Sequence, residues 1–175
     1  MSLRALPLLA LVALAAPLGA QAPKPAAKPV AANPASVRKQ IQGRYDAMSM
    51  LVMRKDGARL AQMLLNMTTP NFAYRDKKGR GFNRAKLISQ LKAQMKMVKA
   101  FKRSGNRVAQ FSLNGRVAKA QVVSDFAMVF PNGKKTVTVA GQSTTADTWV
   151  LTGSGWKLKS IRTLKESVKY DGKPM

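Results

Sequence analysis

The segment DTWVLTGSGWKLKSIRTL, residues 147–164, decides the fold. Apolar and polar residues alternate on both sides of the turn sequence Thr-Gly-Ser-Gly at 152–155, which predicts two antiparallel strands joined by a tight hairpin. Closing the hairpin over this turn pairs Leu151 with Trp156. The last two strands of the chain therefore form a hairpin with one apolar face.

Asp147 falls on that apolar face, because it lies two residues before Trp149 and successive strand side chains alternate between faces. A carboxyl group in such surroundings is desolvated, so its pKa rises unless a cation pairs with it. Arg162 points to the same face if its strand is regular. Two interpretations stay open: an interior Asp147–Arg162 ion pair, or a carboxyl group tuned for function.

From residue 107 onward the apolar period is about two, as in a sheet. Asn114–Gly115 predicts a two-residue turn that pairs Phe111 with Ala118. Pro131-Asn132-Gly133 predicts the next reversal. Together with the hairpin at 152–155, these turns predict a meander of four long antiparallel strands.

Before the meander, three segments have apolar residues at helical spacing. Ser36, Asp56 and Asn83 are their expected N-caps. A short strand at 72–75 and a turn beginning at Asp76 separate the second helix from the third. The apolar rows are Val37, Ile41, Tyr45, Met48 and Val52; Leu60, Met63, Leu64 and Met67; and Leu87, Ile88, Leu91, Met95 and Val98. The fold class is α+β, with three N-terminal helices covering one face of an antiparallel sheet.

The N-terminus has the order of a secretory signal peptide at 1–22: a basic start, an apolar run at 5–18 and small residues for cleavage after Ala20 or Ala22. A Pro/Ala-rich linker follows at 23–35, and the domain occupies 36–175. We expect an exported protein, periplasmic or secreted. The alternative is an uncleaved membrane anchor, although the run is shorter than a spanning helix needs.

The composition excludes several kinds of site. The chain has no cysteine and no histidine, so it has no thiol nucleophile, no disulfide and no imidazole metal ligand. Its seven acidic residues are scattered, and we expect no metal site and no cofactor. The formal net charge of +24 predicts salt-sensitive attraction to polyanions.

The third helix carries a basic stripe, Lys92, Lys96, Lys99 and Arg103, opposite its apolar row. The stripe could bind an anionic membrane surface or an envelope polymer, or it could be a solvated face of a basic protein. We expect no sequence-specific binding of nucleic acid, because no stacking platform or recognition motif accompanies the charge.

Several of these features, in this order, resemble the nuclear transport factor 2-like superfamily, including exported members. They are the two-helix start with Asp56 at the junction, the segment TPNFAYRDKKGRG at 69–81, and the hairpin at 147–164. The resemblance covers about residues 36–168. It implies a cone in which a curved sheet wraps around the helices and leaves a pocket at the open end. The superfamily includes ketosteroid isomerases and SnoaL-like cyclases.

The resemblance also suggests roles for residues. Counted from the hairpin glycines, Asp147 matches the isomerases' protonated acid, and Asp76 matches their general base. The position of their tyrosine donor falls on Met48, and Tyr45, one turn earlier, could replace it. Asp76 also fits an ordinary turn residue.

We therefore expect a noncatalytic domain that binds a small, partly apolar molecule. The alternatives are an isomerase- or cyclase-like enzyme that uses Asp76, Asp147 and Tyr45, and a polyanion-binding envelope protein. A homodimer is possible within the family. The aromatic residues of the expected pocket could equally fill the core. The expected lining is Tyr45, Met48, Tyr74, Phe126, Trp149, Trp156 and Arg162.

Overall fold

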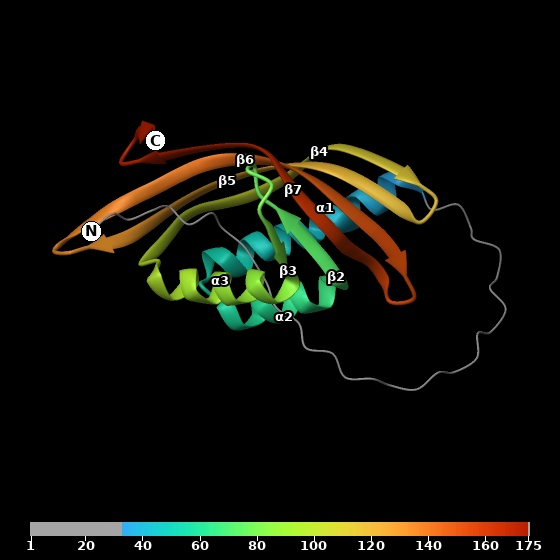
Figure 1. The fold of residues 1–175 in the computed structure, drawn as a ribbon, viewed down its shortest axis with the longest axis horizontal. Helices are drawn as coiled ribbons and strands as arrows, with labels where there is room; N and C mark the ends of the chain where they lie inside the picture. The colour runs from blue at the N-terminus through green and yellow to red at the C-terminus, as the bar shows by residue number, and fades with distance from the viewer. Residues whose placement is uncertain (1–32, 175) are drawn as a thin grey trace.

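The computed structural model describes residues 33–174, so the expected signal peptide and most of the expected linker lie outside the described residues. Helices and strands follow one another along this part of the chain as in Figure 1. They are α1 (Pro34–Met53), α2 (Gly57–Met67), β2 (Thr68–Arg75), β3 (Gly81–Asn83), α3 (Arg84–Met97), β4 (Ala100–Asn114), β5 (Val117–Asn132), β6 (Lys135–Thr152), β7 (Gly155–Tyr170) and β8 (Lys173–Pro174).

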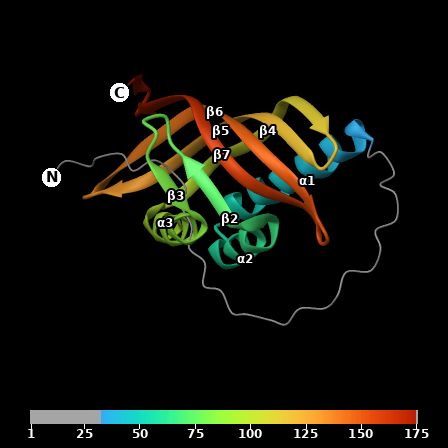
Figure 2. The same cartoon turned by 45° about the vertical axis from the view of Figure 1, so that its right-hand side comes forward.

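One curved sheet runs through the domain in the strand order β3-β2-β7-β6-β5-β4, with β8 paired to β7. All three helices lie on its concave side, as Figures 1 and 2 show. The long strands β4 to β7 form the predicted antiparallel meander. No helix in the described range is long and apolar enough to cross a membrane.

The fold differs in one respect from three helices on an antiparallel sheet. The β2–β3 hairpin separates α2 from α3, and β2 pairs in parallel with β7, so the sheet is mixed. The meander leaves the edge of β7 unpaired there, and β2 satisfies its backbone groups by lying alongside.

Helix starts follow capping chemistry. Asp56 and Asn83 are N-caps as predicted, and their side chains each accept a backbone N–H at 3.0 Å. However, α1 begins at Pro34 with Asn33 as its cap, not after Ser36. Proline suits the first helical position because its missing N–H would have no partner there. The last residues of the expected linker are thus helical.

The last hairpin has the predicted register, with Leu151 opposite Trp156. The β4–β5 turn lies one residue later than the predicted Asn114–Gly115 turn. Asn114 pairs with Val117, so the turn residues are Gly115 and Arg116, and Gly115 takes φ +53° at the first turn position. Because the pairing shifts by two residues, the inward face of both strands is unchanged.

The inward faces of the strands and the apolar rows of the helices form one core. Trp149 is its largest fully buried side chain. From the sheet, it contains Val108, Ala118, Ala120, Val122, Trp149, Trp156 and Leu158; from the helices, Val37, Ile41, Tyr45, Leu60, Leu64, Leu87, Ile88, Leu91 and Met95. The helix-covered half of the cone is therefore closely packed.

Candidate functional site at the inward face of the sheet

Asp147 lies inside this core and is 2% exposed. The buried row of α1 brings Tyr45 against β6, and the Tyr45 hydroxyl donates a hydrogen bond to Oδ2 of Asp147. The two residues are 102 positions apart in the sequence. A tyrosine–aspartate pair is thus the polar centre of the covered half.

Burial raises the pKa of Asp147 to about 6, although the hydroxyl groups of Thr145 and Tyr45 favour the carboxylate and oppose the shift. Burial and the charge of Asp147 raise the pKa of Tyr45 well above its usual value. Tyr45 therefore remains the proton donor of the pair at neutral pH.

Trp149 completes the cluster. Its ring meets Tyr45 edge-to-face at 5.8 Å between centroids, and the Arg44 guanidinium lies 5.8 Å from the Trp149 centroid. Oδ1 of Asp147 and Nε1 of Trp149 are both buried, and within the described chain neither forms a hydrogen bond. An acceptor and a donor thus lie unpaired in the interior, where unpaired polar atoms are costly.

The predicted Asp147–Arg162 ion pair is wrong. Trp149 pairs with Leu158 but Thr148 pairs with Ser160, so Lys159 is an extra residue that forms a β-bulge. The bulge reverses the alternation of the strand, and Ile161 faces Asp147 while Arg162 points to solvent. Arg162 therefore cannot line an interior pocket. Tyr45, not Arg162, is the residue that contacts the carboxyl group of Asp147.

Asp76 is bound within its own turn. Its Oδ1 accepts the backbone N–H groups of Lys78 and Arg80 at 2.8 and 2.9 Å, and the Arg80 Nε–H donates to Oδ2 at 2.6 Å. Burial alone would raise the pKa of Asp76, but these hydrogen bonds and the Arg80 charge lower it overall. The geometry is that of a turn-stabilising aspartate.

Most of the aromatic residues expected to line a pocket fill the core instead. Tyr45, Trp149 and Trp156 are buried between helices and sheet. Tyr74 is also buried, with its hydroxyl 2.9 Å from that of Thr163. Met48 packs against the core from α1, while Phe126 is half-exposed.

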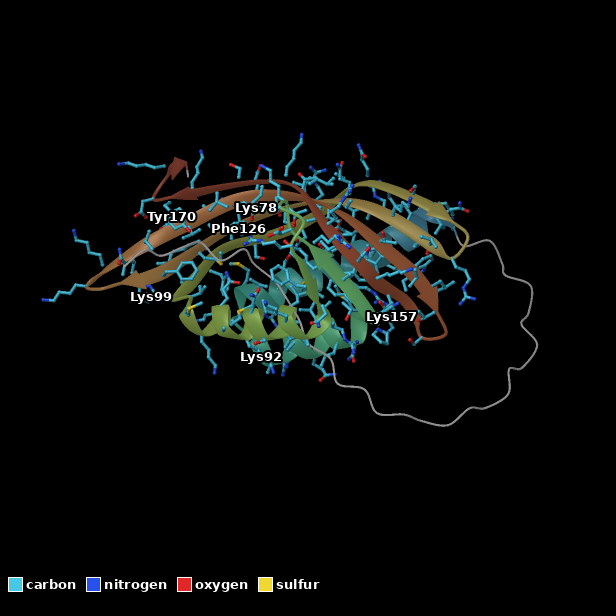
Figure 3. All side chains as sticks on the ribbon, in the orientation of Figure 1. Lys78, Lys92, Lys99, Phe126, Lys157 and Tyr170 are labelled. Carbon is cyan, nitrogen blue, oxygen red and sulfur yellow. The ribbon has the colours of Figure 1, made fainter. Side chains whose placement is uncertain are left out.

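Phe126 belongs to a second set of inward-facing residues that sequence reasoning missed. Phe126 lies on the long strands above α3, as Figure 3 shows, and Gln94 of α3 contacts Met128 two residues further along β5. Register places three rows across β5, β6 and β7 beyond Asp147, which we call the inward patch. Its rows are Val122–Thr145–Thr163, Ser124–Ser143–Glu166 and Phe126–Gly141–Val168. The first row forms the border with the core, because Val122 and Thr163 are buried. Gly141 was the available signal: a side chain there would meet Phe126 and the backbone of Ser167.

Comparison with solved structures identifies the architecture. A nuclear transport factor 2-like superfamily protein from Salmonella enterica aligns over 74% of this chain and 90% of its own, with TM-score 0.52 and 14% identity. A nuclear transport factor 2-like protein from Cytophaga hutchinsonii aligns over 75% of this chain and 98% of its own, with TM-score 0.53 and 9% identity. A type 2 hexachlorocyclohexane dehydrochlorinase aligns over 77% and 90%, with TM-score 0.55 and 9% identity.

This chain has the nuclear transport factor 2-like fold. No protein-family model matches its sequence, and no curated protein matches it significantly. At these identities the likeness shows architecture alone, since this fold carries many unrelated functions.

Two hollows open on the surface of this nuclear transport factor 2-like domain, and neither borders Asp147. One of about 450 Å³ is lined by Arg44, Met63, Asn66, Met67 and Lys157. The other, of about 620 Å³, lies between α1 and β4. Among residues 33–174, no three acidic side chains gather where they could hold a metal ion.

The predicted basic stripe is shorter than expected. Lys92, Lys96 and Lys99 are exposed, and Lys92 lies on the side of α3 away from the sheet (Figure 3). Lys99 and Arg103 do not continue the stripe along the helix, because α3 ends at Met97. Lys99 lies in the connection to β4, and Arg103 belongs to β4, where it forms an ion pair with Asp125.

Proposed function

We propose that the protein binds a small, partly apolar molecule at the inward patch, next to the Asp147–Tyr45 pair, and does not transform it. The observation that carries the proposal is the change in solvent exposure along the inward face of β6. Asp147 is buried, whereas the next inward residues, Thr145, Ser143 and Gly141, are half-exposed. A ligand resting on the sheet there would lie one residue pair away from the polar centre of the core.

The patch has the chemistry of a small-molecule site. Phe126 and Val168 offer apolar contact, and Ser143 and Thr145 offer hydroxyl groups. The Ser124 hydroxyl already donates a hydrogen bond to Oδ1 of Asn106 at 2.6 Å. Oδ1 of Asp147 lies buried beside these residues without contact to solvent, so the hydroxyl groups are the polar groups that a ligand on the patch would meet. These groups suit a ligand with an apolar body and one hydrogen-bond donor.

The hydrogen bonding of Asp76 argues against catalysis, because this residue would have to act as the general base. Its two oxygens are occupied by Lys78 and Arg80, and its lowered pKa makes it a weak base. The acid–base pair suggested by the family resemblance is thus missing its base.

The test is extraction of small molecules from protein purified from its own host, identified by mass spectrometry. We expect a bound molecule on the wild type and at least tenfold less on Phe126→Ala, since the aromatic contact is lost. Phe111→Ala is the matched control, because Phe111 is also inward-facing and half-buried but packs at the helix-covered end. Protein that never carries a ligand, or equal loss in both variants, would refute the proposal.

A second candidate function is proton transfer, and one observation favours it: Tyr45 contacts Asp147, as the substitute donor would have to. A dehydrochlorinase with the same fold is a precedent for catalysis on this architecture. The test is turnover of an enone or ketone substrate by the wild type, Asp76→Asn and Asp147→Asn. Equal rates for all three proteins would exclude this role for the two aspartates.

We also infer export from residues 1–22. Mass measurement of the protein from its host should give a chain that begins at Gln21 or Pro23. An intact Met1 on protein in the cytoplasm would contradict the inference.

A further inference from the structure

The exposed apolar side chains of the described domain are concentrated in one place. The large hydrophobic residues that face solvent are Met50 (54% exposed), Met53 (42%), Met97 (50%) and Val117 (38%). The three methionines lie at the C-terminal ends of α1 and α3, whereas Val117 lies at the β4–β5 turn. Nothing in the core requires methionine at these solvent-facing positions.

The ends of α1 and α3 are neighbours. Lys55, directly after α1, donates from Nζ to the backbone oxygen of Val98 at 2.6 Å and to that of Lys99 at 3.5 Å. At the start of α2, Gly57 lies against Met95 of α3. The methionines of the two helices therefore share one edge of the molecule.

Exposed basic residues flank these methionines in the sequence. Arg54, Lys96 and Lys99 are exposed, and no carboxylate of the described chain lies within 4 Å of them. Asp56, the acid closest in sequence, is paired with Arg59. Asp46 lies one turn before Met50 and accepts a hydrogen bond from Gln42, so the positive region is centred on the helix ends. We call this set the methionine–lysine patch: Met50, Met53, Arg54, Lys96, Met97 and Lys99.

We propose that the methionine–lysine patch docks the protein onto an anionic phospholipid surface. Flexible apolar side chains can enter the boundary between headgroups and acyl chains, while lysine and arginine contact the phosphates. A soluble polyanion would use the cations but has no apolar layer for the methionines, so the patch fits a membrane better than a polymer. Docking does not depend on the inward patch and goes beyond ligand binding.

The experiment is co-sedimentation of the full chain with vesicles of 70% phosphatidylcholine and 30% phosphatidylglycerol at low salt. Reversing three charges in Arg54→Glu/Lys96→Glu/Lys99→Glu should weaken binding roughly 100-fold or more. Replacing the apolar tips in Met53→Gln/Met97→Gln should weaken it roughly 3- to 10-fold. Vesicles of pure phosphatidylcholine should bind little wild type.

The charge control keeps the number of changes and moves them elsewhere, and the apolar control is a single substitution outside the patch. Lys119→Glu/Lys159→Glu/Lys165→Glu alters three exposed lysines whose side chains form no hydrogen bond or ion pair within the described chain. Val117→Gln removes the large exposed apolar side chain that lies outside the patch. All variants share residues 1–32, so differences among them report the domain, and circular dichroism checks their folding. If charge position does not matter, or if the methionine variant binds as the wild type does, the proposal is wrong.

Oxidation gives an independent readout. Peroxide should oxidise Met53 and Met97 several-fold more slowly on anionic vesicles than in solution, because the bilayer covers them. Unchanged oxidation rates with bound protein would show attachment through another surface. Protection by a soluble polyanion such as heparin, equal to that by vesicles, would favour the polymer and contradict the membrane proposal.

Discussion

Asp147 and Asp76 are both buried carboxyl groups, yet the protein treats them in opposite ways. Asp147 lies in the apolar interior with one hydrogen bond from Tyr45, and its pKa is raised to about 6. Asp76 lies in a surface turn with backbone donors and Arg80, and its pKa is lowered. Low exposure does not set the pKa by itself; the number of donors facing the carboxylate decides the direction.

The same difference indicates a structural role for Asp76 and a functional role for Asp147. Asp76 stabilises the turn before β3 and keeps no free oxygen for chemistry. Asp147 leaves Oδ1 unpaired, which costs stability and is the kind of local conflict found at functional sites. The two carboxyl groups should therefore respond to pH with opposite sign.

The sign of each pH effect on stability follows from the difference in pKa between the folded and the unfolded chain. The folded state binds the Asp147 proton more tightly than the unfolded chain does, so this stabilisation is complete below the unfolded value of 3.8 and is lost as the pH rises through about 6. Asp76 contributes stability above its ordinary pKa and loses it as the pH falls through its lowered value.

The largest expected effect comes from Asp147→Asn. A shift from 3.8 to about 6 corresponds to roughly 3 kcal/mol, so between pH 4 and pH 8 the free energy of unfolding of the wild type should fall by about that amount relative to the variant. Urea unfolding across this pH range measures it. A constant difference between the two proteins would mean that Asp147 does not titrate there.

Tyr45→Phe should have the next largest effect. It removes the donor to Asp147 and leaves a buried carboxylate without that hydrogen bond, at a cost of about 2 kcal/mol at pH 8. The loss should be smaller at pH 4, where the carboxyl group is neutral. Equal losses at both pH values would show that packing of the ring edge, not the hydrogen bond, is what the variant disturbs.

Asp76→Asn should have the smallest effect, about 1 kcal/mol at pH 7, because the Arg80 side chain is largely exposed and the pair is screened by solvent. The destabilisation should disappear as the pH falls below the lowered pKa of Asp76, opposite to the behaviour at Asp147. Arg80→Gln provides the control for the ion pair alone. A loss as large as that of Tyr45→Phe would contradict the contrast between the two carboxyl groups.

Regular patterns in the sequence predict much of this structure. Alternation around 152–155 is enough to predict the Leu151–Trp156 pair and the inward direction of Asp147, both of which are confirmed. Helical spacing and capping residues predict α2 and α3 with their buried faces. These features are local, so a single stretch of sequence determines them.

Local irregularities such as bulges and shifted turns cannot be predicted from the alternation of apolar and polar residues. Nothing in the alternation of β7 marks Lys159 as a bulge, and that extra residue alone turns Arg162 outward. The turn at Gly115 and the helix start at Pro34 each lie one or two residues from an alternative site with similar sequence signals, and the hydrogen bonds formed in the folded domain select between them. The Tyr45–Asp147 contact spans most of the domain, so tertiary packing decides it and only the family resemblance pointed to it.

Carboxyl-carbon NMR titration of Asp147, assigned with Asp147→Asn, is the most direct test of a carboxyl group buried beside Tyr45 on the inward face. Its midpoint should lie near pH 6, with Asp76 titrating below its ordinary value in the same spectra. A midpoint for Asp147 at or below 4 would mean that the carboxylate is solvated or paired with a cation, and the site described around it would not exist.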